Sequence, residues 1–414
     1  MGMTTVAWGI VCIVMYLSSL IDVPRLVGLG PVSGLGMLTV FYNCWTWLLW
    51  CLAPALTRRV LSATFFLGLY LAWGCLSLAW CPAVLVGCQN LAVIGAFLGS
   101  MLLCARESRR SHWFRNGVQK ALMWSTVVST ALYCFGLATE GFGATSFLGS
   151  RAFGLFALLG LAYFLSSWRY GSKRCLLWAV LITALIGFGL SRMAFVVALA
   201  LFPLAQRPAR GIREFVRISA WLVLVIAVGY CAIAYIEPLH ARFFSGDMSL
   251  NLGGLTLNAS GRTAFWKTTM DSYWHSWLQG NGAGSSEVLM QATFVDIGHP
   301  HSDYLRILHD CGLVGLTLWL LAMSALLWHV RRAWVRADRL NSNDAALHLT
   351  AFLILVAVSC AMLSDNAMVY IYVMGPAGAL VGTSLGTRMA RRDARPILIM
   401  STPACAQAVM GAVK

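Results

Sequence analysis

The sequence predicts an all-α protein that crosses a membrane many times. Of its 414 residues, 59% are hydrophobic and only 11% are charged, whereas roughly a quarter of the residues in a soluble globular protein are charged. The mean hydropathy is +0.74. Apolar runs of about 20 residues, each long enough to span a hydrocarbon core of about 30 Å, recur along the whole chain. Together these observations exclude an ordinary soluble fold.

The apolar runs predict about twelve transmembrane helices. Their expected ranges are 5–21, 26–56, 60–79, 84–104, 118–138, 152–168, 175–190, 193–206, 218–236, 304–328, 347–364 and 367–385. The seventh and eighth come from one apolar run that only Ser191 and Arg192 interrupt. A single helix there would place the basic segment 207–217 outside, so these two residues are expected at an outer turn between two short helices.

These ranges divide the chain into four regions. They are residues 1–236 with nine transmembrane helices, 237–303 as one long extracytoplasmic loop between the ninth and the tenth helix, 304–385 with the remaining helices, and 386–414 as a cytoplasmic tail. A connection as long as this loop is usually functional or contains helices of its own. A helix is expected over 262–277, and the glycines at 280, 282 and 284 predict a tight turn rather than a phosphate-binding loop, because no strand precedes them.

The net charge of +15 reflects the membrane topology. Lys and Arg residues concentrate in the even-numbered connections and the tail, as in the groups at 106–115, 207–217 and 331–339. Cytoplasmic loops carry such an excess of basic residues. Both termini are therefore expected in the cytoplasm, and no nucleic acid is expected as a partner.

No metal site and no cofactor are expected. The 13 cysteines form no CxxC pair, and the sequence contains no P-loop. His299 and His301 could in principle converge on a metal ion, but no HExxH motif or cysteine cluster accompanies them. The other interpretations of this segment are a catalytic site and a structural cap, since Ser302 or Asp303 can cap the helix that follows.

Histidine and arginine side chains gather in the outer loop and at the helix ends that face it. They are His240, His275, His299, His301, Arg242 and Arg262, with Arg151 and Arg192 at the same face. A neutral histidine is the side chain best suited to accept a proton near pH 7, and a guanidinium fork suits phosphate oxygens. Arg192 is expected either to bind a lipid phosphate or to be a snorkelling or internally paired residue.

Four motifs in this part of the chain resemble those of a known family, in the expected order. Arg151, Gly154 and Phe156 fit an R-x-x-G-x-F segment, and Ser191-Arg192 fits an SR turn. The other two motifs are Ser260-Gly261-Arg262, followed by Trp266 and the glycine turn, and His301-Ser302-Asp303-Tyr304-Leu305, followed by Gly312 and Gly315. Over roughly residues 150–330 the chain thus resembles the O-antigen ligase and Wzy-type polysaccharide polymerase superfamily, membrane glycosyltransferases that use polyprenyl-diphosphate-linked glycans.

The resemblance implies a metal-independent, inverting glycosyltransferase without a cofactor, in the bacterial cell inner membrane. It implies that His301 accepts the proton of the acceptor hydroxyl and that Arg192 and Arg262 hold the diphosphate of the donor. Residues implied to support them are His299, Arg151, Asp303 and Tyr304. Because Ser302 replaces the family's usual Asn after the signature histidine, His299 remains an alternative to His301. The implied partners are an undecaprenyl-diphosphate-linked oligosaccharide donor, a glycan or lipid A-core acceptor, membrane lipid, a flippase and chain-length regulator proteins.

Several activities remain open at this stage. A polymerase extends O-antigen or exopolysaccharide chains, a ligase transfers the finished chain to lipid A-core in lipopolysaccharide biosynthesis, and a relative that glycosylates proteins is a further alternative. The net acidic outer face favours the polymerase, because few basic residues there could hold a phosphorylated acceptor. A flippase or other transporter would also have about twelve spans, but it would place ionisable residues near the bilayer midplane and show internal repeats.

Overall fold

The computed structural model describes residues 2–20, 28–29, 32–144, 148–206, 212–246, 250–252, 255–295 and 297–387. Outside these ranges lie Arg25, Arg207, Arg210, Asp296 and the tail from residue 388 onward. The predictions made for these residues, including the cytoplasmic tail, stay predictions.

Eight helices in the described ranges are long and apolar enough to cross a membrane. They are α1 (Gly2–Ser19), α3 (Gly34–Leu52), α4 (Arg58–Ser77), α5 (Val84–Arg110), α6 (His112–Glu140), α7 (Ser150–Arg169), α10 (Ile212–Tyr235) and α14 (Asp303–Arg339). Four shorter apolar helices accompany them, namely α8 (Arg174–Phe188), α9 (Arg192–Leu204), α15 (Ala345–Ala361) and α16 (Ile371–Gly386). A helical, multi-pass membrane protein is therefore supported.

Each expected span overlaps one of these twelve helices, but the number of crossings stays a prediction. The expected start of the second span at residue 26 is wrong, because Gly28–Leu29 and Val32–Ser33 pair as short strands and the helix begins at Gly34. The 13 residues of α9 extend about 20 Å at 1.5 Å per residue, which is less than the thickness of a hydrocarbon core. The break between α8 and α9 falls at Ser191 and Arg192, as expected from the interrupted apolar run.

Side-chain caps explain where several helices begin. The hydroxyl of Thr57 accepts a hydrogen bond from Val60 N at 3.2 Å before α4, and Ser111 accepts one from Phe114 N at 3.2 Å before α6. Ser302 has an extended backbone, and its hydroxyl accepts from Leu305 N at 3.5 Å. The expected cap of the helix that follows the two histidines is therefore confirmed, with Ser302 in the capping position.

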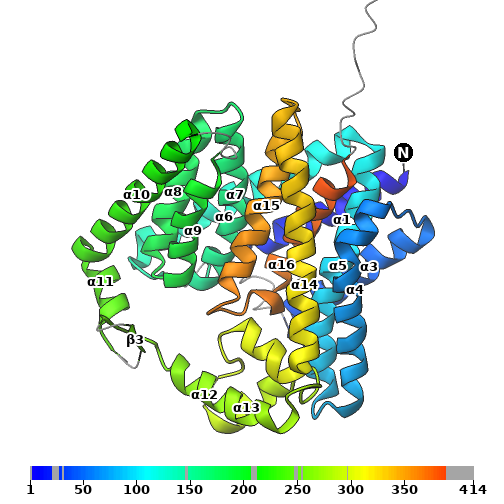
Figure 1. Ribbon diagram of the computed structural model, residues 1–414, viewed down its shortest axis with the longest axis vertical. Coiled ribbons are helices and arrows are strands. Elements are labelled where there is room, and N and C mark those ends of the chain that lie inside the picture. Colours follow the sequence, from blue (N-terminus) through cyan, green and yellow to red (C-terminus); the bar gives the residue numbers. More distant parts are fainter. Residues whose placement is uncertain are drawn as a thin grey trace, which may run out of the picture.

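The segment between α10 and α14 contains short elements. They are α11 (Glu237–Phe244), the antiparallel strands β3 (Leu250–Leu252) and β4 (Leu255–Leu257), α12 (Arg262–Tyr273), the 3-10 turn η2 (Trp274–Ser276) and α13 (Ser285–Thr293). The remaining elements are the strands β1 (Gly28–Leu29) and β2 (Val32–Ser33) and the 3-10 turns η1 (Leu78–Trp80) and η3 (Ala367–Val369). The helix expected over 262–277 is confirmed as α12 and η2. Figure 1 shows α12 and α13 together at one end of α14.

The predicted glycine turn docks on a kink in α14. Gly312 has φ 67° and ψ −169°, which interrupts the helix, and a Cβ atom there would collide with the carbonyl oxygen of Leu278. Asn281 N and Gly282 N donate to the carbonyls of His309 and Asp310, each at 2.9 Å. The turn thus bonds to the carbonyls just before the kink, and it holds the 260–300 segment against the membrane helices.

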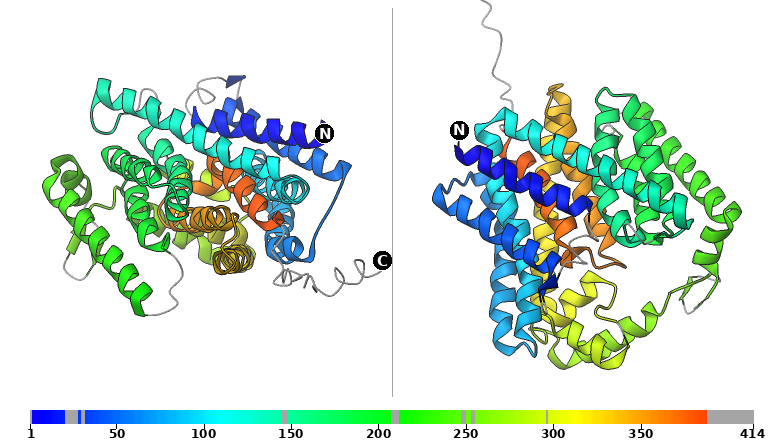
Figure 2. Two further views of the ribbon diagram at one scale, coloured as in Figure 1. Left: turned by 90° about the horizontal axis from the view of Figure 1, so that it is seen from above. Right: turned by 180° about the vertical axis from the view of Figure 1, so that it is seen from behind.

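Close helix packing centres on α5 and α16. Gly378, Gly382 and Gly386 form a stripe on α16, and a Cβ atom at Gly378 would lie only 2.6 Å from the carbonyl oxygen of Phe97 on α5. Small residues spaced by four positions let helix backbones approach in a membrane, where the hydrophobic effect does not drive helices together. Figure 2 shows these helices inside the bundle, with α10 at its periphery.

Candidate functional site

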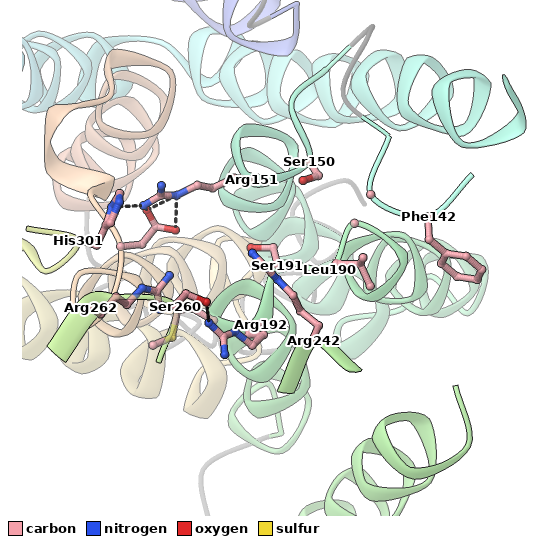
Figure 3. A pocket seen from close by; sticks show the side chains of 14 residues that line it. Phe142, Ser150, Arg151, Leu190, Ser191, Arg192, Arg242, Ser260, Arg262 and His301 are labelled. Carbon is pink, nitrogen blue, oxygen red and sulfur yellow. Dashed lines mark hydrogen bonds and ion pairs between the residues drawn. The ribbon is translucent and has the colours of Figure 1, made fainter. Parts of the chain in front are cut away.

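A cavity of about 460 Å³ lies where several helix ends meet. Its lining comes from the start of α7, the turn between α8 and α9, α11, the start of α12, and the segments that precede α14 and η3. The charged or titratable side chains in the lining are Arg151, Arg192, Arg242, Arg262, His301 and Asp365 (Figure 3). We call this the outer cavity, because the predicted topology places it on the outer side of the membrane.

Arg192 begins α9 and is held by the segment that leads to α12. Its guanidinium donates to the carbonyl oxygen of Asn258 and to the hydroxyl of Ser260, the latter at 2.7 Å. No carboxylate pairs with Arg192 within the described residues, so an internal ion pair finds no support there. The side chain instead joins two elements and faces the cavity.

Arg262 is the first residue of α12 and follows two residues with left-handed backbones, Ser260 (φ 52°) and Gly261 (φ 74°). Burial is the main cause that lowers the pKa of Arg262 to about 10; the neighbouring arginines add to this lowering, and Asp365 opposes it. At pH 7 the guanidinium is still charged. An anion bound in the cavity would relieve the mutual repulsion of these arginines.

A chain of polar contacts links Arg151, Asp365 and His301 (Figure 3). Arg151 Nε donates to both carboxylate oxygens of Asp365, at 2.7 and 2.9 Å. Arg151 Nη2 donates to His301 Nδ1 at 3.0 Å, and Asn366 Nδ2 lies 3.1 Å from the same nitrogen. His301 has a left-handed backbone (φ 56°), a conformation that costs free energy in a residue other than glycine. The contacts thus fix a strained histidine at the wall of the cavity.

The protonation of His301 follows from these contacts. Burial, followed by the charges of Arg151 and Arg262, lowers its pKa to about 4, and Asp365 opposes this lowering, so the imidazole is neutral at pH 7. Arginine can only donate, and Nδ1 must therefore be the acceptor in this arrangement. The ring proton then resides on Nε2.

His299 lies in different surroundings. Its Nδ1 is 3.8 Å from Glu287 Oε2, and burial, followed by the charges of Arg306 and His301, lowers its pKa to about 3. It lines a second cavity of about 300 Å³, which we call the His299 cavity; other polar residues in this lining are Thr39, Gln89, Asn90, Glu287, Tyr370 and Tyr372. The geometry therefore favours His301 over His299 as the residue that meets the arginines.

The interpretation of the two histidines as a metal pair is not supported. They line separate cavities, and the described residues contain no group of three or more His, Cys, Asp or Glu side chains that could hold an ion.

Asp303 and Tyr304, expected as supporting residues, do not line the outer cavity. Asp303 is fully buried, and its Oδ2 accepts from Met368 N at 2.8 Å. The Tyr304 hydroxyl donates to the carbonyl of Ser359 at 3.0 Å. Both side chains therefore anchor the start of α14 to the segments around α15 and η3.

Sequence reasoning missed Asp365 and Asn366. They immediately precede the last expected span, 367–385, on the side predicted to face outward. The available signal was an acid next to an amide at the outer end of an apolar span, a position where polar residues often line a functional site. Their partners lie far away in sequence, 214 residues for Arg151 and Asp365 and 65 for Asn366 and His301.

The fold and the site together define a multi-pass membrane protein with an arginine-rich cavity and a neutral histidine. Residues 177–320 are similar to the Wzy_C family model, which is described as O-Antigen ligase. This match confirms the resemblance to the O-antigen ligase and Wzy-type superfamily and supports a glycosyl-transfer enzyme of the ligase or polymerase type. The matched segment contains Arg192, Arg262 and His301, whereas Arg151 and Asp365 lie outside it. No curated protein matches the chain.

Proposed function

We propose that this protein transfers an undecaprenyl-diphosphate-linked glycan to an acceptor hydroxyl at the outer face of the bacterial inner membrane. The observation that carries the proposal is the convergence of Arg151, Arg192 and Arg262 with a neutral His301 on one cavity. A diphosphate leaving group gains negative charge as the anomeric C–O bond breaks, and guanidinium groups stabilise that charge. The energy for transfer comes from the lipid-linked donor.

The acceptor oxygen attacks the anomeric carbon from the side opposite the diphosphate, so the reaction inverts that centre. The C–O bond to the diphosphate breaks, and the acceptor proton passes to His301. The role of His301 as base requires Nε2 to be free of its proton. In the observed arrangement Arg151 prevents this by donating to Nδ1.

Binding of the diphosphate resolves this difficulty. The anion attracts Arg151 away from His301 Nδ1, and the buried Oδ1 of Asn366, which has no partner among the described atoms, becomes the acceptor for Nδ1–H when the amide turns over. Nδ1 takes up a proton from solvent and Nε2 releases its proton to solvent, so that the ring stays neutral and Nε2 becomes the basic nitrogen. In this proposal, binding of the donor substrate makes Nε2 of His301 able to accept a proton.

Among the possible products, the His299 cavity favours polymerisation. Its described lining contains Gln89, Asn90 and Glu287 but no Lys or Arg. Carboxamides, a carboxylate and tyrosines suit the hydroxyl groups and rings of an uncharged sugar, whereas a phosphorylated lipid A-core would need cations. We therefore place in this cavity a part of the acceptor glycan that is remote from the reacting hydroxyl, because His301 lines the outer cavity. Ligation to lipid A-core is the alternative product.

The decisive experiment measures the chain lengths of lipid-linked glycans extracted from a strain that lacks the protein. A polymerase predicts that single repeat units accumulate. Long lipid-linked chains that never reach their final acceptor would instead establish the ligase. An unchanged pool of lipid-linked glycans would contradict both the polymerase and the ligase activity and would favour a transporter instead.

A further inference from the structure

A second arginine-lined cavity lies at the opposite end of α14, which we call the far cavity. Its volume is about 850 Å³, and its lining comes from α4 and the last turns of α14. The described polar and charged residues in the lining are Arg59, His329, Arg331, Arg332, Arg336 and Arg339.

The charges of the far cavity are not balanced by its walls. No Asp or Glu occurs among its described lining residues. Asp338, which lies on the same helix, is buried and accepts a hydrogen bond from the Tyr170 hydroxyl at 3.0 Å. Arg59 Nη1 donates a hydrogen bond to the backbone carbonyl of Thr387 at 3.2 Å, which adds no negative charge. The sequence that follows Thr387 contains four arginines and one aspartate before residue 396. An external anion would therefore balance the charges of Arg59, Arg331, Arg332 and Arg339, because the described lining contains no carboxylate to pair with them.

Arg59 distinguishes this cavity from ordinary basic loop residues. Its Nε and Nη2 atoms are buried and have no hydrogen-bond partner among the described atoms, although Nη1 is bonded. Cytoplasmic ends of membrane helices are basic in general. Arg109 and Arg174 are such basic residues at helix ends, and both side chains are exposed. Those two residues line none of the cavities described above. A half-buried guanidinium with unused donors beside four exposed ones forms a pocket with a preferred ligand geometry.

The level of the cavity relative to the bilayer indicates the source of the anion. Trp328 is 54% exposed, and the guanidinium of Arg332 lies 5.5 Å from its ring centroid. Exposed tryptophans and arginines mark the level where lipid headgroups meet water. Phosphate oxygens of a lipid at this level can reach the guanidiniums while its acyl chains lie along the apolar surface of α14.

We propose that the far cavity binds the phosphate of an anionic phospholipid headgroup. The guanidiniums of Arg331, Arg332 and Arg339 surround the headgroup, and the unused donors of Arg59 bind a phosphate oxygen at the base of the cavity. This site is independent of glycan transfer and lies at the other end of the bundle.

The test uses the full-length protein purified in detergent, stripped of lipid, and titrated with phosphatidylglycerol or phosphatidylcholine under native mass spectrometry. We expect tighter binding of phosphatidylglycerol. The exposed pair Arg331→Gln with Arg339→Gln should weaken that binding roughly 30-fold, because each basic residue near a lipid surface contributes about 1 kcal/mol. Arg59→Gln should weaken it further, and the exposed pair keeps the test valid if the Arg59 variant fails to fold.

The matched control is Arg109→Gln with Arg174→Gln, which removes the same charge from exposed helix ends. Equal weakening in the control would show a general charge effect and overturn the site, as would equal affinity of the unmodified protein for the two lipids. Sodium pyrophosphate distinguishes the source of the anion. If pyrophosphate protects the protein against thermal unfolding in an Arg59-dependent way while phosphatidylglycerol does not bind, the ligand is a soluble phosphate and the lipid assignment is wrong.

Discussion

The two arginine-lined cavities at opposite ends of α14 differ in how their guanidiniums are held. In the outer cavity Arg151 is fixed by Asp365, and Arg192 by Asn258 and Ser260. In the far cavity four arginines are exposed, and the described lining contains no carboxylate. Fixed guanidiniums can stabilise charge at a defined position as it develops in a transition state. Exposed guanidiniums suit a lipid headgroup whose position varies. Arginines are therefore proposed to support catalysis in the outer cavity and lipid binding in the far cavity.

The largest effect that this comparison predicts is at His301, whose proposed role as a base distinguishes the outer cavity from the far cavity. Replacement of His301 with Ala should lower glycan transfer by roughly 10²- to 10⁴-fold, because a positioned base contributes about that much. His301→Gln should be equally impaired, since a carboxamide can donate a hydrogen bond but cannot act as a base near pH 7. The measurement is transfer from purified lipid-linked donor with the amount of membrane-inserted protein held equal. Substantial activity in His301→Gln would show that His301 acts as a donor through Nε2–H and would refute the base role.

The next largest effect concerns the geometry of the arginines. Arg262→Lys and Arg192→Lys each keep the charge but lose the fork that contacts two oxygens. We expect roughly a 10²-fold loss in kcat/KM for each, in the range found when one donor to a developing anion is removed. Arg109→Lys, at an exposed helix end, is the matched control and should retain normal transfer. Normal transfer in both cavity variants would exclude the diphosphate role.

The sequence could predict the parts of this site that depend on local patterns. The Ser191-Arg192 break, the start of α12 at Arg262 and the cap at Ser302 all follow from neighbouring residues, and the structure confirms each one. The partnership of Arg151 with Asp365 joins residues 214 positions apart and depends on how α7 packs against α15 and η3. The break of α14 at Gly312 was also not predicted, because it depends on the docked glycine turn and not on an apolar pattern.

A pH profile tests whether Arg151 controls His301. The lowered pKa of His301, about 4, keeps the free enzyme's imidazole neutral from pH 7 down to about pH 5, so kcat/KM should fall only in more acidic buffer. Removing a neighbouring cation favours the imidazolium form, and Arg151→Gln should therefore move this acidic limb upward in pH, toward the ordinary value of 6.5. The shift is measured independently of the rate at the plateau. An unmoved limb, with only a lower plateau, would mean that Arg151 acts on the substrate and not on His301.

The smallest expected effect is the response of the outer cavity to salt, and it separates the two cavities most directly. Salt screens exposed charges much more than half-buried ones. Arg192 and Arg262 are half-buried, whereas Arg331 and Arg339 are exposed. Raising the ionic strength from about 0.05 to 0.5 M should weaken phosphatidylglycerol binding roughly tenfold, while the KM for the lipid-linked donor changes less than about threefold. Both quantities are measured in the same detergent, so that micelle effects are shared. If the donor KM rises with salt as steeply as the lipid dissociation constant, Arg192 and Arg262 bind the donor only as a diffuse charged surface. That outcome would contradict the proposal that they hold the diphosphate in a fixed geometry.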